Sequence, residues 1–274
     1  MATLEPRRVA PQDIVSWVKE SVSLLFRRVP LYLSFVLLFF LLHYLGIKAV
    51  EPIAPYVSPV LVLAILFTYL AVVFVFVIAG LILVAYSADH SRRYKFSEYI
   101  HGLLAGQTSL MKIAIFALFI GSFYWVISYT INPNKDLMTY CEKLVTIMLA
   151  QSSLPIEIET RITAAFLYFC LLATFSLRIF YSFPLILFHE ANYNHAQALT
   201  HRAILINIVP MTVVILMWSM VLLGTMLGVS FLSVLLLPVF ANFIYVSYRH
   251  IFLGVAQNLP ARALSHEETA SATG

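Results

Sequence analysis

The sequence predicts an all-α membrane protein with several transmembrane helices, a fold class favoured by its composition, its apolar runs and the placement of its basic residues. Of the 274 residues, 61% are hydrophobic and 11% are charged, whereas about a quarter of the residues in a typical soluble domain are charged. The mean hydropathy is +0.91, and apolar residues extend along almost the whole chain. We expect one helical membrane domain at residues 13–254, an N-terminal tail at 1–12 and a disordered cytoplasmic tail at 255–274.

Six apolar runs are long enough to cross the hydrocarbon core of a bilayer, which takes roughly 20 residues in a helix. They lie at 30–48, 58–87, 109–130, 162–188, 203–227 and 230–254. The second and fourth runs exceed this minimum, so they either tilt or continue into the aqueous layer. An even number of spans places both termini on the same side of the membrane.

The basic residues indicate which side that is, because lysine and arginine are enriched in the cytoplasmic loops of membrane proteins. Of the 17 basic residues, 13 fall on or near the face that carries the termini, and 4 fall on the other face. Those on the other face are Lys48, Lys135, Lys143 and Arg161. Both termini are therefore expected in the cytoplasm.

A short amphipathic stretch, which we call a lead-in helix, precedes every second span. Residues 13–28 place their polar side chains on one helical face and Ile14, Trp17 and Leu25 on the opposite face, a pattern typical of a helix lying in the membrane interface. Similar stretches begin near Ser97 and Asn194. The chain is thus predicted to contain three two-span units, each preceded by an interfacial helix. The alternative is that any loop before a span is amphipathic because it lies along a membrane.

Two elements carry a resemblance to a known family. The first lead-in helix and the following span contain Trp17, Phe26 and Pro30, and the last span contains Pro238 and ends in YVSYRHIF at 245–252. In these elements the chain resembles the uncharacterised six-helix inner-membrane proteins of proteobacteria, which have a W…S…LF…P lead-in and a closing Y-x-S-Y-R-D-I-F element. The resemblance covers about residues 10–253 and implies the fold and a bacterial inner-membrane location, but no established activity. His250 replaces the family's usual acid, which puts a pairing of Arg249 with a carboxylate in doubt.

The sequence contains no template for enzymatic chemistry. A phosphate-binding glycine loop, a nucleophile elbow and a dinucleotide fingerprint are all absent. In HEANYNH, at 189–195, the histidines are six positions apart, which places them on different helical faces, unlike the one-turn spacing of the zinc-protease helix. We therefore expect no catalytic residue, no cofactor, no bound metal and no nucleic-acid partner.

A non-catalytic role is the favoured functional prediction. The chain is expected to be a membrane-embedded partner, scaffold or assembly factor for envelope proteins or lipid, and it could form a homo-oligomer. The candidate partner surface consists of Trp17, Arg27, Arg28, Arg92, Arg93, Tyr248 and Arg249. The alternative is a channel or carrier for a small or lipidic solute, with Arg178 and His43 as intramembrane polar residues. A structural role for Arg178, in which the guanidinium reaches the headgroups, competes with that alternative.

Overall fold

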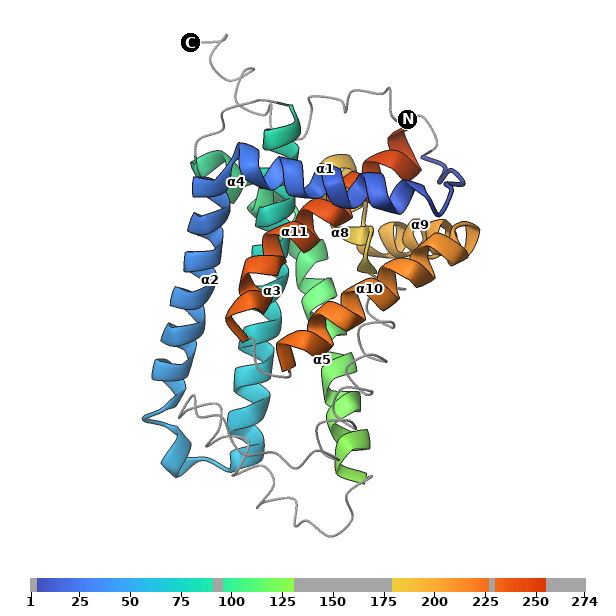
Figure 1. Ribbon diagram of the computed structural model, residues 1–274. Helices are drawn as coiled ribbons and strands as arrows, with labels where there is room; N and C mark the ends of the chain where they lie inside the picture. Colours follow the sequence, from blue (N-terminus) through green and yellow to red (C-terminus); the bar gives the residue numbers. More distant parts are fainter. Residues whose placement is uncertain (1–3, 91–95, 131–178, 227–229, 255–274) are drawn as a thin grey trace, which may run out of the picture.

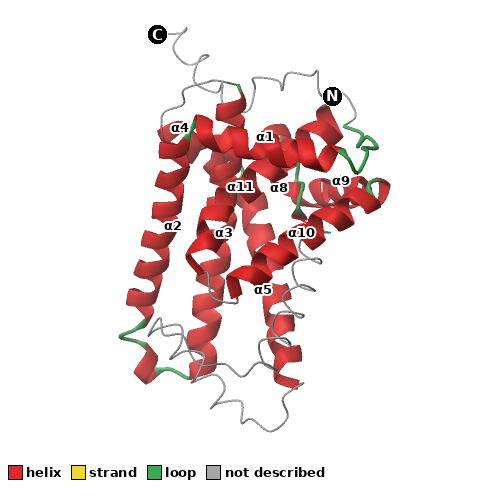
Figure 2. Cartoon of the chain, viewed as in Figure 1, coloured by secondary structure: helices red, strands yellow, loops and turns green. Residues whose placement is uncertain are grey.

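The computed structural model describes residues 4–90, 96–130, 179–226 and 230–254, and all regular structure in these ranges is helical (Figure 2). In chain order the elements begin with α1 (Asp13–Arg27), α2 (Val29–Val50), η1 (Ala54–Tyr56), α3 (Pro59–Asp89), α4 (Phe96–Ala105) and α5 (Gln107–Thr130). They continue with α8 (Ser182–His189), α9 (Tyr193–Ile206), α10 (Ile208–Met226), α11 (Ser230–Tyr248) and η2 (Arg249–Leu253).

The longest helices form an upright group made of α2, α3 and α5 (Figure 1). Pro30 and Pro59 occupy the first turns of α2 and α3, where a missing backbone N–H costs no helical hydrogen bond and the fixed φ suits the helix. Between α2 and α3 the chain turns through the single 3₁₀ turn of η1. α3 has 31 residues and is therefore about 46 Å long, more than the hydrocarbon core of a bilayer requires.

Among the described residues, three helices are long and apolar enough to cross a membrane: Val29–Val50, Pro59–Asp89 and Leu236–Leu253. The number rises to five if each of two bent helix pairs is one span. The pair α4 and α5 bends by 72°, and the pair α9 and α10 bends by 99°. The predicted six spans are therefore confirmed only in part, as an all-helical chain with three to five candidate spans.

Four of the six predicted apolar runs, 30–48, 58–87, 109–130 and 230–254, coincide with helices. The predicted run 203–227 begins in the last residues of α9 and lies mostly in α10, which continues in a different direction after Asn207. Most of the predicted run 162–188, including Arg178, lies outside the described residues. Only its last residues are described, in α8.

α1, α4 and α9 are short helices that each precede a longer one across a break of one residue. α1 and α4 lie across the end of the bundle where α3 and α11 finish, which we call the lead-in end (Figure 1). α1 begins at the predicted Asp13. α9 begins at Tyr193, one residue before the predicted Asn194, and the side chain of Asn192 accepts the N–H of His195 and caps the helix.

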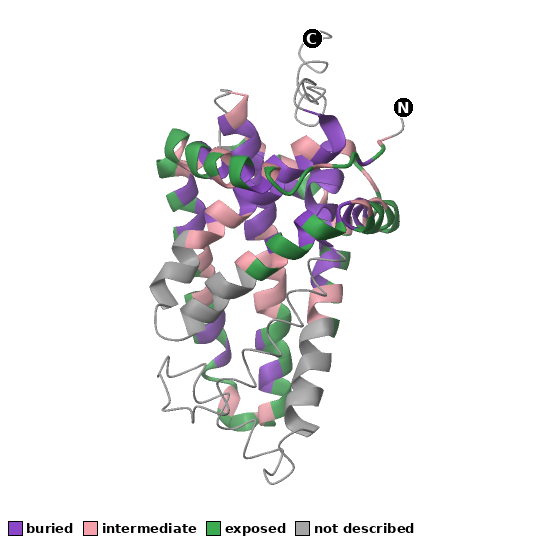
Figure 3. Ribbon diagram, turned by 45° about the vertical axis from the view of Figure 1, so that its right-hand side comes forward, coloured by how far each residue is buried: buried purple, intermediate pink, exposed green. Residues whose placement is uncertain are grey.

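α3 is the central helix, and it packs against α1, α2, α5, α8 and α11. Buried residues concentrate in the half of the molecule nearer the lead-in end (Figure 3), where residues 77–88 of α3 are buried without exception. α2 approaches α3 closely because glycine lies at two contact points. A Cβ at Gly46 would overlap the ring of Tyr69, and one at Gly80 would overlap the ring of Phe35.

Candidate functional site

The largest gathering of charged side chains among the described residues lies at the lead-in end, where α11 passes into the five-residue π-helix η2. Arg249, the first residue of η2, forms ion pairs with Glu20 of α1 and with Asp89 of α3, the latter at 2.6 Å. The hydroxyl of Tyr245 donates to the same Asp89 carboxylate at 2.8 Å. One guanidinium therefore joins α1, α3 and the end of α11. We call Glu20, Asp89, Tyr245, Arg249 and His250 the Arg249 cluster.

Glu20 receives a second positive partner from η2. Nε2 of His250 lies 3.3 Å from the Glu20 carboxylate. Burial by itself would raise the pKa of Glu20, but the hydrogen bond to His250 and the charge of Arg249 together outweigh it, so the pKa lies below its usual value. Glu20 is therefore held in its charged form.

Trp17 adds apolar packing to this junction. It is fully buried, and its ring centroid lies 5.9 Å from those of Phe243 and of His250. α1 thus presents Ile14, Trp17, Ser21 and Leu24 to the protein. Its apolar face therefore packs on α11 and α3, so Trp17 does not reach lipid as an interfacial anchor.

α8 joins the same region through an aromatic layer. Phe188 packs against Tyr86, Tyr245 and Tyr248, with ring centroids 5.0 to 6.0 Å apart. The imidazole of His189 is hydrogen-bonded to the Tyr248 hydroxyl. Burial lowers the pKa of His189, so its neutral form is favoured at this contact.

Residues 7–9, within the predicted N-terminal tail, are hydrogen-bonded to the rest of the molecule. The N–H of Arg7 donates to the carbonyl of Ile251 at 2.8 Å. Asn207, at the bend between α9 and α10, accepts the N–H of Val9 at 2.8 Å and donates to the carbonyl of Arg7 at 2.9 Å. Gly254 has φ +71°, and a Cβ there would overlap the Arg7 guanidinium. The segment is therefore held between η2 and the α9–α10 bend.

The predicted partner surface divides into interior and exterior residues. Trp17 and Tyr248 are fully buried and Arg249 is largely buried, so these three belong to the packing beneath the surface and are not accessible to a partner. Arg27 is exposed and Arg28 is half-buried. Arg92 and Arg93 lie outside the described residues.

The doubt about a carboxylate partner for Arg249 is resolved by two acids that are distant in sequence. Glu20 and Asp89 are 229 and 160 positions away from Arg249, whereas the acid that the resemblance implies would stand at the neighbouring position 250. A signal was present, since Glu20 follows the buried Trp17 by one helical turn and Asp89 ends the long apolar run of α3. Nothing in the local pattern, however, indicates which acid meets which arginine.

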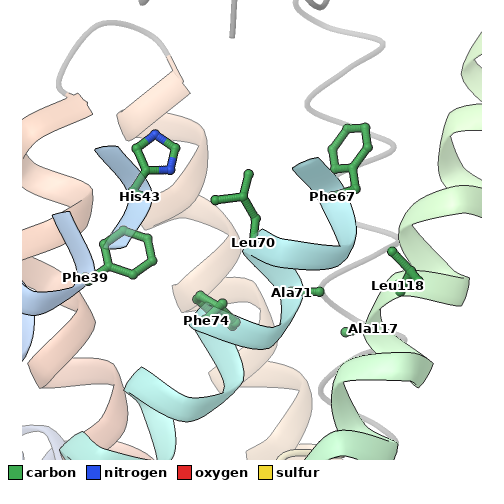
Figure 4. Close-up of a pocket in the computed structure, with 8 residues that line it drawn as sticks. All are labelled: Phe39, His43, Phe67, Leu70, Ala71, Phe74, Ala117 and Leu118. Carbon is green, nitrogen blue, oxygen red and sulfur yellow. The ribbon is translucent and has the colours of Figure 1, made fainter. Parts of the chain in front are cut away.

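His43, the second predicted intramembrane residue, lines a cavity of about 320 Å³ between α2, α3 and α5 (Figure 4). Nδ1 of His43 is buried and has no hydrogen-bond partner among the described residues. None of the eight lining side chains carries a permanent charge. They are Phe39, His43, Phe67, Leu70, Ala71, Phe74, Ala117 and Leu118.

Within the described ranges, no three His, Cys, Asp or Glu side chains lie close enough together to hold a metal ion. No protein-family model, curated protein or solved structure matches the chain. The resemblance to the proteobacterial six-helix proteins therefore stays a prediction, and the functional inference depends on the geometry of the lead-in end and of the His43 cavity.

Proposed function

We propose that this chain is a non-catalytic integral protein of the bacterial inner membrane that serves as a membrane-embedded partner or scaffold for other envelope proteins. The observation that carries the proposal is the exposure of a large apolar side chain on each lead-in helix. Phe26 of α1 is 73% exposed, Leu104 of α4 is 49% exposed and Leu205 of α9 is 56% exposed. Exposed apolar groups beside basic residues are typical of protein or membrane contact sites.

The apolar stripe of α1 is exposed and open to a protein partner. Val15, Val22 and Phe26 share one face of α1 and are exposed, and we call them, together with Arg27, the lead-in surface. At 100° per residue, this apolar stripe is centred about 140° around the helix from the buried face. Because the buried face points toward α3 and α11, the stripe points away from the bundle and is open to a partner.

The proposed topology has three two-span units and both termini in the cytoplasm. The described basic residues support it, since Arg7, Arg8, Lys19 and Arg27 belong to the N-terminal segment and α1 at the lead-in end. At the opposite end, Lys48 is paired with Glu51 at 2.6 Å, which reduces its contribution to the charge asymmetry. The lead-in end would then face the cytoplasm.

The test replaces Phe26 with the photoreactive analogue benzoylphenylalanine in cells that express the full chain. Irradiation is expected to give a discrete protein adduct, and Arg27→Glu should weaken that adduct several-fold without unfolding the helices. The same analogue at Leu41, an exposed residue within α2, is the matched control and should give lipid adducts only. If position 26 also yields only lipid adducts, α1 lies in lipid and the partner proposal is wrong.

Transport of a small or lipidic solute is the second candidate, and the His43 cavity is the observation in its favour. A transporter needs polar or ionisable groups along its path, and His43 is the one titratable side chain among the described residues that line the cavity. Purified protein in liposomes distinguishes the candidates. Solute movement that is abolished by His43→Leu and unaffected by Arg27→Glu would favour transport over partner binding.

A further inference from the structure

The His43 cavity lies deep within the apolar part of the bundle, away from the Arg249 cluster. His43 is 14 residues after the start of α2 and 7 residues before its end, which places it about 21 Å and about 10 Å from the two ends along the helix axis. The facing residues, such as Leu70 and Phe74, lie in the middle of α3. A ligand that reaches this cavity from the surrounding bilayer must therefore be soluble in hydrocarbon.

His43 is exceptional among the polar side chains nearby. The Tyr69 hydroxyl donates to the carbonyl of Leu42 at 2.6 Å, and the Thr68 hydroxyl donates to the carbonyl of Ala64 at 2.7 Å. Nδ1 of His43 is buried but has no such partner within the described part of the chain. A buried polar atom without a hydrogen bond is unfavourable, so a ligand that supplies the missing hydrogen bond would gain affinity at this position.

The cavity walls select for a neutral apolar ligand. Phe39 stacks on the His43 ring with an interplanar angle of 12°, and the remaining described lining consists of phenylalanine, leucine and alanine (Figure 4). No charged side chain is present among these residues to compensate a phosphate or an ammonium group. A headgroup of that kind would lose its hydration without gaining a counter-charge from the described lining residues.

The size of the cavity suits a headgroup or a length of chain. A volume of about 320 Å³ corresponds to about ten groups of the size of a water molecule. Phe67, in the cavity wall, is 42% exposed, so the cavity reaches the outer surface of the helix group. A longer chain can therefore leave the cavity and continue along the lipid-facing side of α3.

From these observations we propose that the cavity between α2, α3 and α5 binds a neutral lipid whose polar end, a hydroxyl or a carbonyl group, forms a hydrogen bond with His43. Either tautomer of the neutral imidazole offers one donor and one acceptor, so both kinds of polar group fit. The apolar part of the ligand fills the space between Phe39 and Phe74. This lipid site is independent of the lead-in surface. If no partner binds to the lead-in surface, the proposal for the lipid site is unaffected.

The test uses the full chain in nanodiscs of phosphatidylethanolamine and phosphatidylglycerol, with three photoreactive diazirine probes of equal chain length. One probe ends in a hydroxyl group, one in a ketone and one in a plain methyl group. We expect the hydroxyl or the ketone probe to label the α3 peptide at residues 67–74 about three- to tenfold more than the methyl probe, the gain typical of one hydrogen bond. Which of the two labels more strongly identifies the polar group.

Three variants assign the labelling to the cavity. His43→Leu should abolish the preference for the polar probes, His43→Gln should keep part of it, and Ala71→Phe should block labelling by all three probes because it fills the space. Leu41→Ala, on the exposed face of α2, is the control and should change nothing. Equal labelling by all three probes of the wild-type chain would overturn the proposal and show only acyl-chain filling. Full labelling of the Ala71→Phe variant would also overturn it, because the labelled site would then lie elsewhere.

Discussion

At the scale of single residues, Arg249 connects a carboxylate of α1 with a carboxylate of α3. The planar guanidinium can donate to Glu20 and Asp89 from different edges, whereas a lysine ammonium is a single point of charge. All three side chains are largely shielded from solvent, with exposed fractions of 15 to 30%. Replacing Arg249 should therefore lower the stability of the fold, because both shielded carboxylates would remain without their positive partner.

We expect Arg249→Leu to destabilise the docking of α1 by roughly 3 kcal/mol, the lower part of the range for breaking a buried ion pair, because some solvent contact remains. Arg249→Lys should recover only part of this loss. The measurement is denaturant unfolding in detergent, followed by the fluorescence of Trp17 in a chain from which the other two tryptophans, Trp125 and Trp218, have been removed. Arg27→Ala, which removes an exposed arginine at the same end, should change the free energy of unfolding by less than about 0.5 kcal/mol. Equal effects at positions 27 and 249 would contradict the role of the cluster.

Lowering the pH should undock α1 from the bundle, because Glu20 becomes protonated and no longer carries the charge that pairs with Arg249. The folded-state pKa of Glu20 lies below its unfolded value, which is near 4.3, so the unfolded state takes up the proton first as the pH falls. The stabilising contribution is complete above about pH 4.3 and is lost as the pH falls through the folded-state pKa. The emission of Trp17 should report this loss in a chain carrying Trp125→Phe and Trp218→Phe.

Glu20→Gln is the matched variant for the pH measurement, and in it the transition below pH 4.3 should weaken. His189 also resists protonation in the folded state, so its contribution falls as the pH drops below the unfolded histidine value of about 6.5. That earlier step should persist in the Glu20→Gln chain and disappear in a His189→Gln chain. An unchanged transition below pH 4.3 after Glu20→Gln would show that another group controls α1.

At the scale of helices, the contact between α2 and α3 depends on small residues that face aromatic rings. Gly80 leaves room for the ring of Phe35, and Gly46 leaves room for that of Tyr69. Between spanning helices, where lipid is as apolar as the side chains, close packing supplies much of the association. The position of α2 beside α3 is therefore sensitive to volume at these two glycines.

Gly80→Ala should destabilise the pair by about 1–3 kcal/mol, because the new methyl group overlaps the Phe35 ring in a packed interior. Phe35→Leu should restore part of the loss when the two changes are combined, and a double-mutant cycle of unfolding free energies measures that coupling. Gly106→Ala is the control, since its Cβ would overlap no ring and would approach only the side chains of Ile186, at 3.3 Å, and Leu110, at 3.7 Å. Additive effects at positions 35 and 80 would show that the two residues do not limit each other.

At the scale of the whole molecule, the proposed topology places the lead-in end in the cytoplasm. A reporter domain fused after Gly274 should therefore give the signal of a cytoplasmic location. A reporter inserted at Tyr56, which is highly exposed in the turn between α2 and α3, should be active as a periplasmic one. Alkaline phosphatase and green fluorescent protein fusions at both positions measure this directly. The reverse pattern would invert the charge-based orientation.

Sequence patterns predicted the elements of this fold better than their connections. The wheel of residues 13–28 located α1 correctly because the periodicity of a helix is a local property. The bend at Asn207 was not predicted, because an apolar run shows the composition of a segment but not the direction of its helix axis. Asn207 is also followed by further apolar residues. The burial of Trp17 and the pairing of Arg249 depend on contacts across 160 positions or more, which no window along the chain can detect.

The ion pair between Glu20 and Arg249 also has a consequence for the order in which the chain is made. The two residues are 229 positions apart, and a ribosome that adds 5–20 residues per second needs about 10–45 s to pass from one to the other. During that interval α1 has been synthesised, but the arginine and Phe243 that receive it do not yet exist. The first of the described helices, α1, is therefore held in place by the last, η2. In a translation product that stops before residue 249, α1 would have no docking site. The undocked helix would be accessible to the proteases that degrade incomplete membrane proteins.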